Sequence, residues 1–350
     1  MTGLPLGAFS LNPGAVKVGA ALGDEIIDLT GTFDGLFDEG TLDALLAAGF
    51  DVWNQVMVEL PSIAGRVPHF PRVSATMHLP CRIGDYVDFY SSLWHARNVG
   101  RIFRPGTDPL TPNWRHLPIG YHGRSGTIVI DGTPVRRPRG QRGEGDFGPS
   151  RKLDFELEVG FITGNGPAGP IPVEEAERYI FGLVLVNDWS ARDIQSWEYQ
   201  PLGPFLGKSF ATSISPWVVP LSALESFRID PLEQDPPPIP YLAPAGQSIN
   251  LELEVSLNGQ VITRSNFRNL YWTMSQQLAH ATCNGATIRA GDLFASGTIS
   301  GPDQTSLGCL LEITDNGTKG AYLEDGDEVV LRGWAGEVDF GTCSGTVVGA

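Results

Sequence analysis

The sequence predicts an α+β protein that is rich in β-structure. Its 350 residues are enough to bury a large core, and its 43 glycines and 27 prolines favour many short strands and turns over a helix bundle. Asn258 and Gly259 lie between two strand-like runs, at 251–257 and 260–263, which is the strongest hairpin signal in the chain. Short strands and glycine turns are also the dominant pattern of the last 60 residues.

The first 60 residues predict a small module with both strands and helices. Short alternating patterns at 16–19 and 25–29 indicate strands. Residues 42–48 follow a threonine that can cap a helix and are closed by a glycine, and Asp51 opens a second helical pattern. This module is expected to form a unit of its own.

A proline-rich stretch separates this module from the rest. Residues 61–80 carry four prolines, weak periodicity and few acidic side chains, which is typical of a linker. We therefore expect a domain boundary near residue 80, with a small domain at 1–80 and a larger one at 81–350.

The composition excludes some classes of partner. Lys and Arg together number 24 against 40 Asp and Glu, and the net charge of −16 argues against nucleic acid or an anionic membrane. The longest apolar run, 180–186, is too short to span a bilayer, and no basic export signal precedes Lys17. We expect a soluble cytoplasmic protein. The cysteines lack any C-x-x-C pair and are interpreted as reduced core thiols: Cys81, Cys283, Cys309 and Cys343.

The segment after residue 84 concentrates polar side chains with aromatic ones. Tyr86, Phe89 and Leu93 fall at helical spacing, which predicts a helix there. His95 follows Asp88 by seven residues, about two helical turns, so the two could share a face. A loop dense in Tyr, His, Arg and Gly comes next and is typical of a ligand cleft, although many such loops simply make turns.

Two glutamates stand in one predicted strand. Glu156 and Glu158 lie within 152–161, and alternation along a strand sends both carboxylates to the same face. Their apolar neighbours belong to the other face. Like charges side by side repel unless a cation or strong donors lie between them, so the pair indicates either a solvated face or a binding site.

A further carboxylate, Asp188, ends a buried apolar strand. Such a position suits a functional acid, but taken alone it is better explained as a cap for the helix that follows. On that helix Arg192, Gln195 and Tyr199 share a face. Lys208 then stands alone as a cation in a loop rich in Gly and Pro.

These residues together suggest metal-assisted hydrolysis. Carboxylate oxygens are the ligands of hard divalent cations, so convergence of the four acids would favour Mg²⁺ or Ca²⁺ over zinc. His95 is a candidate base, and Glu312, in an expected strand at 310–314, is an acid that could orient it. Cationic and amide donors suited to a developing oxyanion complete the set: Arg192, Gln195 and Lys208.

Long motifs resemble the fumarylacetoacetate hydrolase family. They are VDFYSSLWHARNVG, HLPIGYHGR, KLDFELEVGF, VNDWSARDIQSWEYQPLGPFLGKSF and LFASGTISGP. The likeness runs from about residue 85 to the C-terminus, and the N-terminal module resembles, in shortened form, the family's SH3-like barrel. The resemblance implies a large mixed β-roll domain and a homodimer. It also implies hydrolysis of the carbon–carbon bond of 4-fumarylacetoacetate, a small diketo acid, to fumarate and acetoacetate, the last step of tyrosine and phenylalanine catabolism.

The resemblance also implies roles for individual residues. His95 would be the general base, oriented by Glu312, and Arg192, Gln195 and Lys208 would stabilise the oxyanion and the leaving carbanion. The Mg²⁺ or Ca²⁺ ligands would be Asp88, Glu156, Glu158 and Asp188, with Lys208 and Thr212 near a second cation site that shares Asp188. Substrate contacts would come from Tyr90, Arg104, Tyr121, Arg192, Gln195, Tyr199 and Thr298. Ala211 and Gln200 depart from the family pattern and put the substrate identity in doubt more than the reaction type.

Two rival functions are weighed against this one. Another superfamily member, such as an acylpyruvate hydrolase or a β-keto-acid decarboxylase, would use the same chemistry on a related substrate; the YHGR motif, the Lys208 loop and the N-terminal module favour the first reading. A binding protein in which a cation only staples strands is the rival of another class. It gives no reason for a base, an acid partner and three oxyanion donors.

Overall fold

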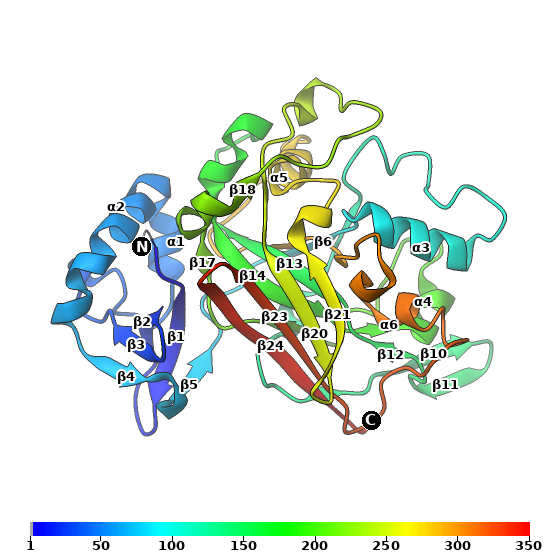
Figure 1. The fold of residues 1–350 in the computed structure, drawn as a ribbon, viewed down its shortest axis with the longest axis horizontal. Coiled ribbons are helices and arrows are strands. Elements are labelled where there is room, and N and C mark those ends of the chain that lie inside the picture. Colours follow the sequence, from blue (N-terminus) through cyan, green and yellow to red (C-terminus); the bar gives the residue numbers. More distant parts are fainter. Residues whose placement is uncertain (1–2) are drawn as a thin grey trace.

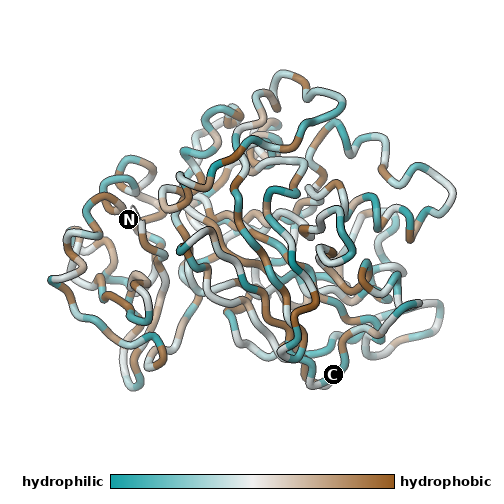
Figure 2. The backbone as a smooth tube through the Cα atoms, in the orientation of Figure 1, coloured by the Kyte–Doolittle hydropathy of each residue, from teal (hydrophilic) through white to brown (hydrophobic). Residues whose placement is uncertain are grey.

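The computed structural model describes residues 3–350 and shows a β-rich protein of mixed strand direction, as the sequence predicted. A small unit that contains the N-terminus lies beside a larger unit made of the remaining elements (Figure 1). Hydrophobic positions gather along the strands inside the larger unit, whereas the outer loops are mostly hydrophilic (Figure 2). Of the helices in residues 3–350, none combines the length and apolar character that crossing a membrane requires.

The small unit is an antiparallel sheet of five strands with two helices. The strand order is β4-β3-β2-β1-β5. Gly49, at φ +83°, separates the two helices, a backbone conformation that favours glycine. The strands predicted at 16–19 and 25–29 and the two helices are confirmed to within a few residues. The elements are β1 (Leu6–Leu11), β2 (Lys17–Leu22), β3 (Glu25–Asp28), α1 (Asp43–Ala48), α2 (Phe50–Ile63), β4 (His69–Pro71) and β5 (Ala75–His78).

A mixed sheet forms the centre of the larger unit. Its order is β7-β6-β22-β13-β14-β16-β8, with β17 also paired to β14. The β6–β22 and β16–β8 pairs are parallel and the others antiparallel. The strands are β6 (Tyr86–Phe89), β7 (Gly120–His122), β8 (Ile128–Ile130), β13 (Leu157–Thr163), β14 (Ile180–Asp188), β16 (Thr212–Ile214), β17 (Val219–Pro220) and β22 (Leu293–Ala295).

A second five-stranded sheet contains the predicted hairpin. Its order is β21-β20-β23-β24-β9, and Asn258 and Gly259 both have positive φ between β20 and β21, as a two-residue hairpin turn requires. Its strands are β9 (Val135–Arg136), β20 (Glu252–Leu257), β21 (Gln260–Asn266), β23 (Glu328–Ala335) and β24 (Val338–Val348). The two-stranded pairs are β10 (Arg139–Gly143) with β11 (Asp146–Pro149), β12 (Leu153–Asp154) with β15 (Ser190–Ala191), and β18 (Arg228–Ile229) with β19 (Ser248–Ile249). The remaining α-helices are α3 (Leu93–Phe103), α4 (Arg192–Glu198), α5 (Met274–Thr282) and α6 (Leu310–Ile313).

Strand β14 is buried on both faces and joins two cores. Leu183 and Leu185 belong to the main core of the larger unit. Val184 and Val186, which point the other way, belong to a cluster that includes Trp53 of the small unit. Because this cluster crosses residue 80, the small unit covers one face of the central sheet; the division into domains at that position stays a prediction.

Three local predictions were wrong. Residues 86–93 were expected to be helical, but Tyr86–Phe89 is strand β6 and the helix starts only after Ser92, which accepts a hydrogen bond from the His95 amide. The aromatic spacing of this segment suits a helix or a strand, and hydrogen bonding to β22 and β7 selects the strand. The predicted strand at 310–314 is helix α6. Cys283 is exposed, although all four cysteines were placed in the core.

Candidate active site

Four buried carboxylates of the central sheet converge: Asp88 lies in β6, Glu158 in β13, Asp188 in β14, and Glu156 immediately precedes β13. β6 pairs with β22, β22 with β13, and β13 with β14, so acids at matching heights on these strands become neighbours. At least one oxygen of each lies within 4.8 Å of the others, and every one of the four residues is buried. The cluster that the sequence predicted is therefore assembled by the central sheet: Asp88, Glu156, Glu158 and Asp188.

Two of these carboxylates are only partly satisfied by the protein. Asp88 Oδ1 and Glu158 Oε1 are buried and have no hydrogen-bond partner among residues 3–350. Burial, and then repulsion from Asp188, raise the pKa of Asp88 well above its ordinary value. Burial and repulsion from Asp88 do the same to the pKa of Glu158. Unpaired buried oxygens within reach of one another are a donor set that fits a hard divalent cation such as Mg²⁺ or Ca²⁺.

The other two carboxylates already hold protein cations. Lys208 Nζ lies 2.5 Å from Glu156 Oε2 and 2.6 Å from Asp188 Oδ2. Arg192 Nη2 lies 2.7 Å from Glu156 Oε1. Burial alone would raise the pKa of Glu156, but Lys208 and Arg192 outweigh it and lower that pKa. Thr212 Oγ1 donates to Asp188 Oδ1 at 3.3 Å.

Lys208 is held as a cation by two of the carboxylates. Burial disfavours its ammonium form, but Asp188 and Glu156 more than compensate and raise the pKa of Lys208. A protonated amine has no lone pair to coordinate a metal. Lys208 would therefore lie beside a bound cation and share its carboxylates.

A histidine and a glutamate form a second, separate cluster. His95 Nδ1 lies 2.7 Å from Glu312 Oε2, and both side chains are buried. Burial raises the pKa of Glu312, but the His95 charge and the hydrogen bonds from His95, Ser300 and Asn98 lower it overall. An ionised carboxylate can only accept, so the proton lies on Nδ1 of His95. His95 Nε2 makes no hydrogen bond to residues 3–350, which leaves it available to the cavity.

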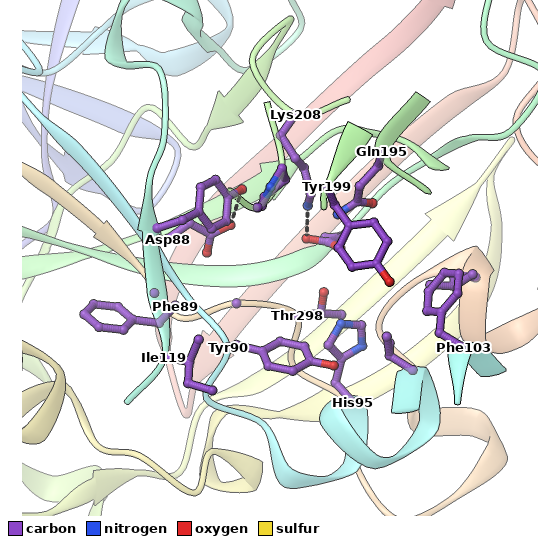
Figure 3. Close-up of a pocket in the computed structure, with 18 of the residues that line it drawn as sticks. Asp88, Phe89, Tyr90, His95, Phe103, Ile119, Gln195, Tyr199, Lys208 and Thr298 are labelled. Carbon is purple, nitrogen blue, oxygen red and sulfur yellow. Dashed lines mark hydrogen bonds and ion pairs between the residues drawn. The ribbon is translucent and has the colours of Figure 1, made fainter. Parts of the chain in front are cut away.

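Members of both clusters line one cavity of about 390 Å³: Asp88 and Glu156 from the acid cluster, and His95 from the other; Glu158, Asp188 and Glu312 are not part of its lining. Figure 3 shows Lys208 and Asp88 on one side of it, with His95, Tyr90 and Thr298 on the other. Thr298 Oγ1 is buried without a hydrogen-bond partner in residues 3–350. Every residue expected to contact substrate lines this cavity: Tyr90, Arg104, Tyr121, Arg192, Gln195, Tyr199 and Thr298.

Comparison with known proteins agrees with this geometry. A sequence profile described as "Fumarylacetoacetate (FAA) hydrolase C-terminal" matches residues 86–348. Fumarylacetoacetase of Mus musculus is 46% identical over 99% of this chain and 95% of the relative. The Arabidopsis thaliana enzyme is 46% identical over 99% and 94%, and that of Homo sapiens 43% over 99% and 95%.

The chain belongs to the fumarylacetoacetate hydrolase family. It is therefore a hydrolase, as the motifs predicted. Among solved structures, fumarylacetoacetate hydrolase from psychrophilic Exiguobacterium antarcticum superposes with a TM-score of 0.65 at 18% identity, covering 99% of this chain and 100% of that one. Maleylpyruvate hydrolase from Sphingobium sp. SYK-6, solved with manganese(II) ion and pyruvate, gives 0.62 at 15% identity, with coverage of 99% and 100%. These two share the fold of the family.

In this family member the relation predicted between Asp88 and His95 is wrong. The two were expected on one helix face, two turns apart. Asp88 instead lies within strand β6, one residue before its end, whereas His95 lies in the first turn of α3. They still line the same cavity, because the chain turns between strand and helix at residues 90–92.

Three polar residues that hold the site were missed. Ser300 Oγ donates to Glu312 Oε2 at 2.6 Å, and Asn98 Nδ2 donates to Glu312 Oε1 at 2.8 Å. Asp154 Oδ2 accepts from Arg192 Nε at 2.8 Å. Asp154 had a readable signal, since it precedes Glu156 by two residues and so continues the acidic face. For Ser300 and Asn98, sequence spacing to Glu312 gave no such signal.

Proposed function

We propose that the protein hydrolyses 4-fumarylacetoacetate to fumarate and acetoacetate, the last step of tyrosine and phenylalanine breakdown. The observation that carries this proposal is that one cavity is lined by members of two clusters: Asp88 and Glu156 of a carboxylate group suited to a divalent cation, and His95, which is held by a buried carboxylate. Relatives that bear the name fumarylacetoacetase and match this chain over nearly their full length support the substrate.

His95 is the general base in this proposal. Its Nδ1 proton is held by Glu312, so Nε2 can take a proton from water aimed at the substrate carbonyl. Glu312 also stabilises the imidazolium that forms. The water oxygen bonds to the carbonyl carbon, the carbon–carbon bond breaks, and the electron pair departs with the acetoacetate fragment as an enolate, which is finally protonated.

Arg192, Gln195 and Lys208 stabilise negative charge in the proposed reaction. All three line the cavity, and two carry full positive charge in a site shielded from water. Arg192 and Lys208 both contact Glu156, which keeps the two cations adjacent despite their repulsion. Gln195 accepts from Arg192 Nη1 at 3.2 Å, so its amide group points toward the same region.

Asp88, Glu156, Glu158 and Asp188 would hold Mg²⁺ or Ca²⁺. When bound, such a cation would supply Lewis acidity that favours the enolate of a 1,3-diketone. A second cation site beside Lys208 and Thr212, sharing Asp188, belongs to the same proposal. Thr212 supports it, since its Oγ1 is an oxygen that lies 3.3 Å from Asp188 Oδ1.

Substrate would be held by the remaining polar lining of the cavity. The single O–H of Tyr121 lies within hydrogen-bond distance of Asp88 Oδ2, at 2.9 Å, and of Asp188 Oδ2, at 3.0 Å, which places a phenol between the cavity and the acid cluster. The Tyr90 ring lies edge-on to His95, with centroids 5.4 Å apart. Arg104 is the cation that suits a distal carboxylate of a diketo acid. Tyr199 and Thr298 complete the set.

The proposal extends to the architecture and setting of the chain. We infer that the unit before residue 80 is a shortened SH3-like barrel and that the rest is a mixed β-roll. The free thiols support a reducing, cytoplasmic compartment. Exposed apolar side chains gathered at Trp197, Leu202 and Phe205 support a homodimer, which sedimentation would detect as twice the mass of the chain.

The direct test is loss of the substrate's absorbance on adding enzyme and a divalent cation. We expect turnover of fumarylacetoacetate well above that of acylpyruvates, measured at equal concentrations in one panel. Turnover of acylpyruvates with none of fumarylacetoacetate would replace the proposed substrate with that of the related hydrolases. Metal binding without turnover of any diketo acid would leave only the binding-protein alternative.

A further inference from the structure

Asp154 is fully buried, and its carboxylate accepts hydrogen bonds from residues that belong to both sides of the site. Its Oδ2 accepts from Arg192 Nε at 2.8 Å. Its Oδ1 accepts from the Leu310 amide at 2.7 Å, and its Oδ2 also accepts from the Leu311 amide at 2.9 Å. One carboxylate thus contacts the proposed oxyanion donor and the start of helix α6.

Helix α6 depends on this contact. The first amides of a helix have no partner within it and normally receive a side-chain cap. The residue at the cap position, Cys309, makes no such hydrogen bond, and Asp154 takes its place from another part of the chain. Glu312, the partner of His95, sits in this single-turn helix two residues after Leu310. Displacing the helix would therefore displace the carboxylate that orients the base.

The guanidinium of Arg192 is fixed on the same side. Nη2 faces Glu156 and Nη1 donates to Gln195, while Nε is held by Asp154. A planar guanidinium held by different acceptors on different nitrogens has one orientation available. Of these three acceptors, Asp154 is the one that also binds α6.

We propose that Asp154 is a positioning residue. It fixes the orientation of Arg192 relative to the His95–Glu312 pair on the other side of the cavity. This inference rests on the proposed function, in which the two groups act on one substrate. Asparagine cannot replace it, because its amide would direct a donor at either Arg192 Nε or a helix amide. Glutamate keeps the charge but is longer by one methylene, which would push the two sides apart.

The first test compares Asp154→Asn with Asp28→Asn. Asp28 is a matched control, since it is a buried carboxylate that binds one cation, Lys17, and one backbone amide, far from the cavity. For D154N we expect kcat to fall roughly 10- to 100-fold, the usual cost of losing a group that orients a site residue, with KM changed little. Cation affinity, measured by titration calorimetry with Mn²⁺, should stay within about threefold of wild type if the acid cluster is intact. D28N should lose stability but keep its kcat.

The second test asks whether Asp154 acts through its two partners. D154N is combined with Arg192→Gln and, separately, with Glu312→Gln. In each background its further cost in kcat should be smaller than in the wild type but not abolished, because one of the two groups that it positions is already gone and the other remains. If D154N lowers kcat in either background by as much as it does in the wild type, Asp154 does not act through that partner, and the inference is overturned.

The remaining outcomes are also decisive. A kcat for D154N equal to that of D28N would overturn the inference while leaving the proposed function standing. An inactive wild type would overturn the proposed function and the inference with it. Should D154N fail to fold, Asp154→Glu takes its place: a folded variant with kcat reduced at least tenfold supports the inference, and wild-type kcat overturns it.

Discussion

The buried carboxylates on the two sides of the site differ in their hydrogen-bond partners and in the direction of their pKa shifts. Glu312 accepts hydrogen bonds from His95, Ser300 and Asn98, and its pKa is lowered. Asp88 and Glu158 each keep one buried oxygen without a partner in residues 3–350, and their pKa values are raised. Burial acts on all three, so the difference comes from their neighbours.

This contrast separates what the chain supplies by itself from what it must take from solution. A buried carboxylate that accepts enough hydrogen bonds from the protein needs no further ligand. A group of acids too close to ionise together needs a further positive charge. The first side can orient a base in the isolated chain, whereas the second acquires its proposed role only with a cation.

Removal of divalent cations would break the comparison most visibly. After treatment with a chelator we expect turnover of fumarylacetoacetate to fall roughly 10⁴-fold, since a catalytic metal contributes several kcal/mol and each 1.36 kcal/mol is a factor of ten. Adding back Mg²⁺ or Ca²⁺ should restore it. Unchanged turnover in protein shown by elemental analysis to be free of metal would refute the need for a cation at Asp88 and Glu158.

The opposite side is tested by His95→Ala. We expect kcat to drop by roughly 10²- to 10⁴-fold, the range for a lost general base. Affinity for the divalent cation should stay near wild type, because His95 is absent from the acid cluster. Calorimetry and single-turnover kinetics measure the two quantities. Near-wild-type turnover would remove His95 from the mechanism.

Glu312→Gln should have a smaller effect. The glutamine amide can still meet His95, but it no longer holds a negative charge beside the ring, so we expect roughly a 10- to 100-fold loss in kcat. Glu177→Gln is the matched control, since Glu177 is hydrogen-bonded to Arg228 outside the cavity. Equal turnover in the two variants would show that the His95–Glu312 contact does not matter for catalysis.

The smallest effect concerns a buried carboxylate that has a single cation. Burial raises the pKa of Asp28, but hydrogen bonds from Lys17 and Thr30 lower it overall, below the ordinary 3.8. Folding therefore favours the ionised form, so this stabilisation is present above about pH 4 and is lost as the pH falls through the folded-state pKa. Because Lys17 is 35% exposed, we expect Lys17→Met to cost only about 0.5–1 kcal/mol.

Denaturant unfolding of the wild type and of Lys17→Met at pH 7 and at pH 3 measures this stabilisation. The difference between the two proteins in the free energy of unfolding should be smaller at the lower pH. A gap that widens on acidification would contradict the assigned sign.

The sequence was most informative where a local signal and the tertiary structure agree. The Asn258-Gly259 turn and the alternation that unites Glu156 with Glu158 both depend on neighbours along the chain. The buried strand expected at 181–186 could be predicted because it is apolar on both faces, and it is observed as β14, Ile180–Asp188. Long motifs supplied the rest of the site, since the ligands themselves are scattered over many residues.

The failures have a common physical cause. Tyr86 and Phe89 fit a helix by spacing, yet partner strands claim their backbone groups. Residues 310–314 end in the β-branched pair Ile313 and Thr314, but the carboxylate of Asp154 binds the amides of Leu310 and Leu311 and favours a helical turn. In both cases the deciding hydrogen bond comes from a segment distant in sequence, which a window of local residues cannot contain.

The two-sided burial of β14 ties the beginning of the chain to its chemistry. The Trp53 ring packs edge-on against Phe181, with centroids 5.4 Å apart, on the strand whose other end carries Asp188. A chain shortened to start near residue 80 would turn an apolar sheet face toward water and invite aggregation. A substitution that removes the Trp53 ring would thus lower the amount of folded enzyme in a cell, while the kcat of the molecules that do fold would be unchanged.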